Sequence, residues 1–229
     1  WTEEQLGSKH RVLANLLDDT ASRYQDAAHY SEALPLAKRA LDIAEQVHDP
    51  THTSTSTRLN NLALLYQDMG RYDEALPLFE RALAIVEQVH GAGHPSTSPA
   101  LNNLALLYQD TGRYAEALSL LERALAVSEQ VHGDTQPDTG TRLNNLASLY
   151  KDMGRYEEAL PLLERALDIA EQVHGSVHTN TSSSLNNLAS LYQDAGRYNE
   201  ALPLLERALA IDEKVHGAEH PSTGISLNN

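Results

Sequence analysis

The chain has 229 residues, of which 41% are apolar, contains no cysteine, and carries a formal net charge of −15 at neutral pH. The missing cysteines exclude a disulfide framework and thiol chemistry and fit a cytoplasmic protein, and no apolar run approaches the roughly 20 residues of a membrane span. The acidic charge argues against nucleic acid and anionic membranes as partners, because binding to both depends on Lys and Arg.

A segment of 42 residues recurs along the chain. Residues 59–100 and 101–142 are identical at 29 of 42 positions. The sequence Leu-Asn-Asn-Leu-Ala marks the copies and begins at Leu59, Leu101, Leu143 and Leu185. Such a period is typical of a solenoid, in which each unit buries its apolar face against its neighbours. It predicts an extended binding surface and not an enclosed catalytic pocket.

We expect residues 1–229 to form a single repeat array. Its degenerate first repeat spans about 8–50, where Asp18 and Asp19 replace the two asparagines. The full repeats span about 51–92, 93–134, 135–176 and 177–218. Residues 219–229 begin a sixth copy. Because a solenoid cannot end well three residues into a repeat motif, we expect a longer native protein or a missing capping segment.

Each repeat is predicted to form two helices, as residues 53–91 illustrate. The Ser/Thr run 53–57 offers candidate N-caps for the first helix. An apolar stripe at helical spacing follows, formed by Leu59, Leu62, Ala63 and Tyr66. Gly70 ends this helix, since glycine is favoured just after a helix C-terminus.

The second helix of the same repeat begins with Asp73 and Glu74, acidic residues that suit a helix N-terminus. Its apolar stripe comprises Ala75, Leu76, Phe79, Ala82, Leu83, Val86 and Val89. His90 and Gly91 end it. Strand signals are absent, so the sequence predicts an all-α fold with five helix pairs.

The pattern formed by Leu62, Ala63, Tyr66, Gly70, Tyr72, Ala75 and Ala82 resembles the tetratricopeptide repeat. The 42-residue form, with Gly-Arg-Tyr and the His94-Pro95 turn, is similar to the repeats of kinesin light chain and its prokaryotic relatives. The resemblance covers residues 11–229. It implies a right-handed superhelical solenoid of helix–turn–helix units, with the first helix of each pair lining a concave groove. Such arrays serve as peptide-binding scaffolds, as adaptors and as sensor modules of larger signalling proteins.

The first helices carry the predicted binding groove. Opposite their apolar stripe lies a recurring set of positions, which the resemblance places on the groove side. These are Asn60, Asn61, Leu64, Gln67, Asp68, Asn102, Asn103, Leu106, Gln109, Asp110, Asn144, Asn145, Ser148, Lys151, Asp152, Asn186, Asn187, Ser190, Gln193 and Asp194. The two asparagine columns offer donors and acceptors to the backbone of an extended peptide. Asparagine can instead bond the neighbouring helix and fix the angle between repeats, and we expect one column to do each job.

A carboxylate clamp is not expected. Some members of the family hold a ligand's terminal carboxylate with Asn at the positions of Asn61, Asn103, Asn145 and Asn187. Those members also have Lys one turn earlier. The corresponding residues here are Thr57, Pro99, Thr141 and Ser183.

Two further columns bear on ligand preference. An aspartate stands near each first-helix C-terminus, where an anion is unfavourable: Asp26, Asp68, Asp110, Asp152 and Asp194. We expect local pairing with the Arg three residues on, at Arg71, Arg113, Arg155 and Arg197; otherwise the column makes a groove that favours neutral or basic peptides over acidic ones. Leu64 and Leu106 give way to Ser148 and Ser190, which makes the N-terminal half of the groove more apolar.

Histidines recur at the ends of the second helices, at His48, His90, His132, His174 and His216, and four have a second His four residues on, at His52, His94, His178 and His220. Two His at this spacing on one helix can bind zinc. Here Gly or Pro usually interrupts the pair, so we expect a helix-terminal His followed by a loop turn, with no metal. No phosphate-binding loop, Ser/His/Asp set or paired-carboxylate constellation is present, and the sequence predicts no cofactor.

The sequence therefore predicts a non-enzymatic protein–protein interaction scaffold that binds an extended peptide segment. The first alternative is a sensor or regulatory module of a larger signalling or effector protein. The second is a structural array that self-associates through its open ends.

Overall fold

The computed structural model describes residues 3–47, 51–133 and 135–217. The predicted start of a sixth repeat at 219–229 lies outside these residues, as do His48 and His220. The described part contains helices and no strand, which confirms the all-α prediction. The helices are α1 (Glu3–Asp26), α2 (Tyr30–Val47), α3 (Thr53–Asp68), α4 (Tyr72–His90), α5 (Thr97–Asp110), α6 (Tyr114–His132), α7 (Pro137–Asp152), α8 (Tyr156–His174), α9 (Thr179–Asp194) and α10 (Tyr198–His216).

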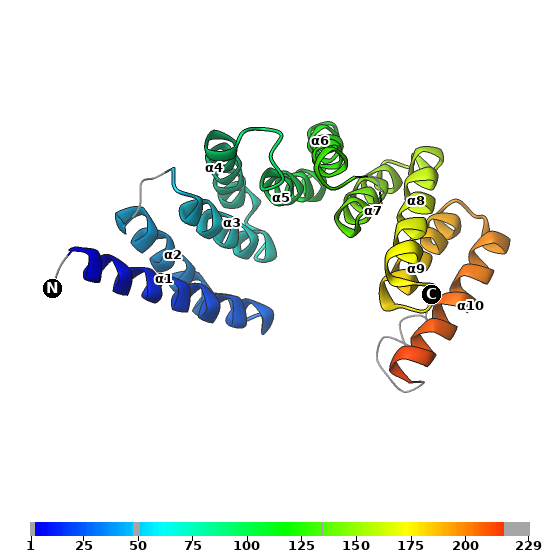
Figure 1. The fold of residues 1–229 in the computed structure, drawn as a ribbon, viewed down its shortest axis with the longest axis horizontal. Coiled ribbons are helices and arrows are strands. Elements are labelled where there is room, and N and C mark those ends of the chain that lie inside the picture. Colours follow the sequence, from blue (N-terminus) through cyan, green and yellow to red (C-terminus); the bar gives the residue numbers. More distant parts are fainter. Residues whose placement is uncertain (1–2, 48–50, 134, 218–229) are drawn as a thin grey trace. The chain divides into compact units, whose positions relative to one another are not determined.

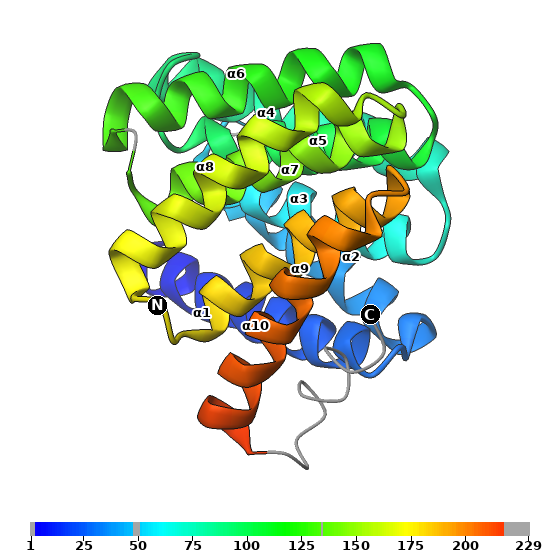
Figure 2. The same cartoon turned by 90° about the vertical axis from the view of Figure 1, so that its right-hand side faces the viewer.

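The chain forms two compact units, Trp1–Leu120 and Leu121–Asn229, and the boundary falls within α6. In the first unit α1 packs on α2 and α3 on α4, each second helix running back along the first (Figure 1). In the second unit α8 lies beside α7 and α10 beside α9 (Figure 2). The two-helix repeat predicted from the sequence is therefore present in each unit.

A left-handed glycine makes the turn within a repeat. Gly70 has φ +70°, a conformation that costs other residues energy. It lets the Arg71 N–H donate to the carbonyl of Tyr66 at 2.8 Å and the Gly70 N–H donate to that of Gln67 at 2.8 Å. These bonds satisfy carbonyls at the end of α3 that have no helical partner. Gly70 thus ends the first helix, as predicted.

The core contains most of the two predicted stripes. It also includes Leu65 and Ile85, which the prediction left out, whereas Val89 of the second stripe is 47% exposed. Leucines at the start of the repeat motif are fully buried, at Leu59, Leu101, Leu143 and Leu185. Alanines fill the close crossings of the helices and are likewise buried, at Ala63, Ala75, Ala82, Ala105, Ala147, Ala159 and Ala189. Burial of these side chains against the adjacent helix provides most of the stability of such a repeat.

The start of the first helix differs from the prediction. The side chains of the Ser/Thr run do not cap α3; instead the Nδ1 atom of His52 accepts a hydrogen bond from the backbone N–H of Ser54 at 3.0 Å. His178 caps α9 in the same way through Asn180, at 3.1 Å. Thr55 is fully buried. His52 and His178, the second His of their pairs, therefore supply the acceptor that helix capping requires.

Candidate binding face on the first helices

The predicted groove residues share one side of the first helices in each unit. We call this set the first-helix face. Most of its side chains are partly exposed, whereas Asn102 is only 9% exposed and is part of the packed interior. In the first unit α3 contacts α1 and α5, and in the second unit α7 contacts α9. Corresponding side chains of successive repeats therefore come within bonding distance.

The asparagine columns bond to each other between repeats. The Nδ2 atom of Asn103 on α5 donates to Oδ1 of Asn60 on α3 at 2.8 Å. In the second unit Asn187 on α9 donates to Oδ1 of Asn144 on α7 at 3.2 Å. Both columns contribute to each pair, so the expected division, with one column for ligand and one for geometry, does not hold at these pairs. The pairs link neighbouring first helices.

In the degenerate first repeat an aspartate takes the place of the asparagine that bonds the next repeat. Asp18 on α1 stands 42 residues before Asn60 and hydrogen-bonds the side chain of Asn61. It also lies 3.2 Å from the guanidinium of Arg58, measured to Nε. Burial nevertheless raises the pKa of the Asp18 carboxyl above its ordinary value, against the opposing attraction of Arg58. Burial therefore costs the charged carboxyl more than the attraction of Arg58 returns.

The aspartate column bonds to the preceding repeat. Gln25 donates to Asp68 at 2.6 Å, and Gln67 donates to Asp110 at 2.6 Å. Because the amide is neutral, these bonds satisfy carboxylate oxygens without cancelling the charge. The first-helix face of the first unit is therefore acidic.

The expected pairing of these aspartates with the following arginines was wrong. Arg71 instead bonds Glu74 at 2.6 Å, and its guanidinium lies 4.6 Å from the centre of the Tyr66 ring. The same pair recurs as Arg113–Glu116, Arg155–Glu158 and Arg197–Glu200. The reason is the turn at Gly70, which ends the helical register of Asp68, whereas Arg71 begins the register of Glu74.

A hollow in the second unit gathers several predicted residues. It measures about 240 Å³ and is lined by Asn144, Asn145, Ala147, Ser148, Lys151, Leu163, Asn187 and Ser190. At its edge the Lys151 ammonium lies 3.0 Å from the Ser190 hydroxyl and 3.1 Å from Asp194. Lys151 stands where the neighbouring repeats have glutamine, so here a cation compensates the aspartate. Six of the predicted residues thus surround one concave site.

A hollow in the first unit is lined by a different set of residues. It measures about 200 Å³, and its lining includes Asp18, Gln25, Asp26, Asn61 and Leu64. Its charge is acidic and its apolar wall comes from Leu64. The hollow of the second unit has Ser148 and Ser190 at the corresponding position. The Leu-to-Ser change predicted to bias the groove therefore lies on the first-helix face in both units.

The two histidines of a pair stack on each other at the connection between successive repeats. The rings of His90 and His94 stack with their centres 4.8 Å apart, and those of His174 and His178 stack at 4.7 Å. The Nδ1 atom of His94 accepts from the backbone N–H of Ser96 at 3.2 Å. The described residues contain no group of three or more His, Asp or Glu that could hold a metal. The side chains of His132 and His216 lie outside the described set.

Sequence reasoning missed two residues of α1 that continue the first-helix face into the degenerate repeat. Asp18 and Gln25 line the first-unit hollow and bond the next repeat, although the degenerate repeat was left out of the predicted set. The 42-residue period could have found them, because they precede Asn60 and Gln67 by one repeat.

No helix in the described part of the chain is long and apolar enough to cross a membrane.

Comparison with known proteins assigns the family. The sequence profile of the tetratricopeptide repeat matches residues 30–88, 54–130, 97–172, 138–214 and 180–229. The chain therefore belongs to the tetratricopeptide repeat family. Its 42-residue units are of the kinesin light chain type. No curated protein matches the sequence.

Solved structures show the same relationship. The nearly identical repeats of a kinesin light chain from Podospora anserina are 30% identical, cover 90% of this chain and 98% of their own, and superpose with a TM-score of 0.77. BtubC (BKLC) of P. vanneervenii is 25% identical over 96% of this chain and 88% of its own, with a TM-score of 0.80. A Rap protein solved with the competence and sporulation factor is 15% identical over 94% of this chain and 63% of its own, with a TM-score of 0.71, and shares the fold.

These findings define the class of protein. The chain is an all-α repeat solenoid of the kind that forms protein–protein interaction modules. This fold is generally a non-enzymatic scaffold.

Proposed function

We propose that the first-helix face binds an extended segment of a partner protein, with neutral or basic segments preferred over acidic ones. The observation that carries the proposal is the second-unit hollow, where six predicted polar residues surround a space of about 240 Å³. Asn144 and Asn187 bond each other there, and each amide has further donor and acceptor capacity of the kind that a peptide backbone requires along its length.

Charge supports the preference for neutral or basic segments. Asp68 and Asp110 bond neutral glutamines and keep their negative charge. An acidic segment would meet repulsion there, whereas Lys or Arg would find a partner. In the second unit Lys151 neutralises Asp194, so we expect weaker selection for basic residues at that unit.

The repeats supply fold-compatible substitutions for the test. Ser148→Leu and Ser190→Leu place in the second unit the residue that Leu64 and Leu106 hold in the first. A displayed peptide library is selected on the full chain, and the enriched sequences are then measured on the parent and on the double variant. Glu164→Gln, an exposed change on the second helix α8, is the matched control.

The proposal predicts that the enriched sequences lose about tenfold in affinity for the double variant and keep it for Glu164→Gln. Circular dichroism checks that both variants remain folded. Equal binding to the parent and the double variant, or no enrichment at all, would overturn the proposal.

A further inference from the structure

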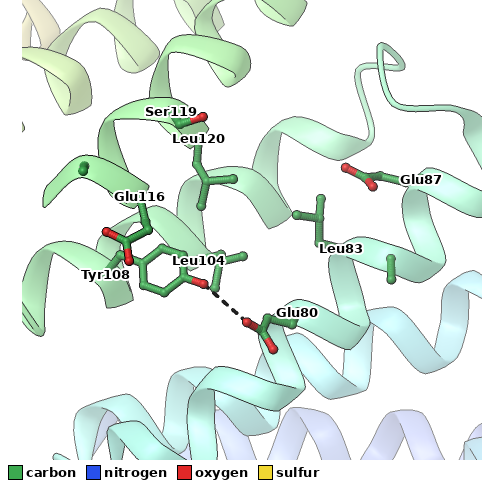
Figure 3. Close-up of a pocket in the computed structure, with 10 residues that line it drawn as sticks. Glu80, Leu83, Glu87, Leu104, Tyr108, Glu116, Ser119 and Leu120 are labelled. Atoms are coloured by element: carbon green, nitrogen blue, oxygen red, sulfur yellow. Dashed lines mark hydrogen bonds between the residues drawn. The ribbon is translucent and has the colours of Figure 1, made fainter. Parts of the chain in front are cut away.

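A second hollow lies on the other side of the first unit, between second helices. It measures about 540 Å³, within the range of about 300–1,000 Å³ that ligand pockets occupy. Residues of α4, α5 and the first turns of α6 line it (Figure 3). It shares no lining residue with the first-helix face, and we call it the α4–α6 hollow.

The lining is apolar below and acidic at the rim. Leu83 and Leu104 are buried on its floor, Leu120 is half-buried beside them, and Ala84 and Ala115 form low walls. The rim carries three carboxylates, Glu80, Glu87 and Glu116, which Figure 3 shows around the leucines. An apolar base with a carboxylate beside it favours a ligand that is apolar at its tip and cationic next to that tip.

The rim carboxylates differ in their bonding partners. Glu116 is paired with Arg113 at 2.9 Å. Glu80 instead accepts a hydrogen bond from the Tyr108 hydroxyl at 3.3 Å (Figure 3). Burial, and then the charge of Glu80, raises the pKa of Tyr108, so its hydroxyl stays protonated and donates. The donor is neutral, and the nearby Arg113 makes its ion pair with Glu116, so Glu80 can also accept a cation from a ligand.

Helix α6 has smaller side chains beside the α4–α6 hollow than the other second helices have at the equivalent positions. Ser119 stands where the other second helices have Pro35, Pro77, Pro161 and Pro203. Ala115 stands where the flanking repeats have the acids Asp73 and Glu157. Both substitutions replace a larger or charged side chain by a small one on the wall of the hollow. This repeat therefore has smaller side chains at two positions of the hollow than the equivalent positions of its neighbours.

We propose that the α4–α6 hollow binds a bulky apolar side chain of a partner protein that is flanked by Lys or Arg. The apolar side chain lies on Leu83, Leu104 and Leu120, and the flanking cation lies at Glu80. This contact is separate from the first-helix face, so the protein can hold two segments, or two parts of one partner, at once.

Disulfide trapping on the full chain tests the proposal, because the protein has no cysteine of its own. Ser119→Cys places one thiol at the wall of the hollow. Pro161→Cys places it at the equivalent, exposed position of α8 and is the matched control. Three acetylated and amidated peptides are used as probes: Cys-Gly-Lys-Leu-Lys, Cys-Gly-Lys-Ser-Lys and Cys-Gly-Glu-Leu-Glu. The mercaptoethanol concentration that releases half of each peptide is measured by mass spectrometry.

At Ser119→Cys we expect the Lys-Leu-Lys peptide to withstand about tenfold more reductant than either other peptide, since non-covalent contacts stabilise the mixed disulfide. At Pro161→Cys we expect the mercaptoethanol concentrations for the three peptides to differ by less than about threefold. Adding Glu80→Gln to Ser119→Cys should reduce the advantage of Lys-Leu-Lys over Glu-Leu-Glu and keep its advantage over Lys-Ser-Lys. The proposal would be overturned if the three peptides differed equally at the two cysteines. It would also be overturned if Glu80→Gln left the advantage of Lys-Leu-Lys over Glu-Leu-Glu unchanged. Ser148→Leu and Ser190→Leu should leave the trapping unchanged, which separates this site from the first-helix face.

Discussion

The side-chain amide of Asn103 donates a hydrogen bond at 2.8 Å to Oδ1 of Asn60, 43 residues earlier in the chain. The separation is one repeat plus one residue. Gln67 and Asp110, and Lys151 and Asp194, are separated by the same number. Successive first helices within a unit therefore lie beside each other with an offset of one residue, and polar pairs between them follow that offset.

The Asn103–Asn60 pair should contribute to stability. Replacing Asn103 by Ala removes a hydrogen bond between α3 and α5, and we expect a loss of about 0.5–1.5 kcal/mol in the free energy of unfolding. A double-mutant cycle with Asn60→Ala, followed by urea unfolding, measures the coupling between the two side chains. Additive losses would mean that the pair does not fix the repeats.

The same pairs limit the use of asparagine substitutions as tests of ligand binding. Asn144 accepts from Asn187 and donates to the Gly140 carbonyl at 3.0 Å. Alanine there should therefore lower stability as well as affinity, which confounds a binding experiment. Ser148 is exposed, and its replacement by Leu tests binding with less disturbance of the scaffold.

Lys151 should control the charge preference of the second unit. Lys151→Gln restores the residue that the neighbouring repeats carry and removes the cation beside Asp194. Since the pair is partly exposed, we expect a stability change below about 1 kcal/mol. Peptides selected on the variant should contain more Lys and Arg than those selected on the parent. An unchanged composition would argue against the aspartate column as a determinant of ligand charge.

His94 should stabilise the turn that leads into α5 through its ring nitrogen. His94→Ala removes the acceptor for the Ser96 N–H and the stacking on His90, and we expect a loss of about 1 kcal/mol. His94→Asn retains a side-chain acceptor at this position and should recover part of that loss. Thermal unfolding followed by circular dichroism gives both values, and an Asn variant no better than Ala would show that accepting this hydrogen bond is not what His94 contributes.

Asp18 should make stability depend on pH. Its folded-state pKa is raised, so the folded protein binds the proton more tightly than the unfolded chain does. The cost of burying the charge is present at pH 7 and disappears as the pH falls through the raised pKa. Asp18→Asn keeps an acceptor for Asn61 and removes that cost, so we expect the variant to melt higher than the parent at pH 7.

The difference between the Asp18→Asn variant and the parent should shrink as the pH is lowered from 7 to 4, and paired melting curves over this range measure it. A difference of opposite sign at pH 7, or one that grows on acidification, would mean that attraction to Arg58 outweighs burial.

The sequence predicted the helices well, because their causes are local. The apolar stripe from Leu59 to Tyr66 and the turn at Gly70 depend on residues within a few positions of each other. The bonds of Asp68 could not be predicted in this way. They depend on the offset between neighbouring first helices, which the packing of complete repeats determines, and so its partner is Gln25 and not Arg71.

The α4–α6 hollow was missed for a different reason. Ser119 and Ala115 are small exposed residues with no reactive or charged group. A search of the sequence for reactive or charged motifs therefore does not find them. The signal was the departure of Ser119 from the proline found at Pro77, Pro161 and Pro203. Within a near-identical repeat, the positions that differ are therefore as informative as the ones that recur.

A partner segment bound along the first-helix face can be located directly on the chain. The most direct measurement is photo-crosslinking of the full chain with the best selected peptide carrying a benzophenone group, followed by mapping of the crosslinked residues by mass spectrometry. We predict crosslinks on the first helices, at or next to Leu64, Leu106, Ser148 and Ser190, and their loss with excess unlabelled peptide. Competed crosslinks confined to the second helices α4, α8 and α10 would contradict binding along the first-helix face.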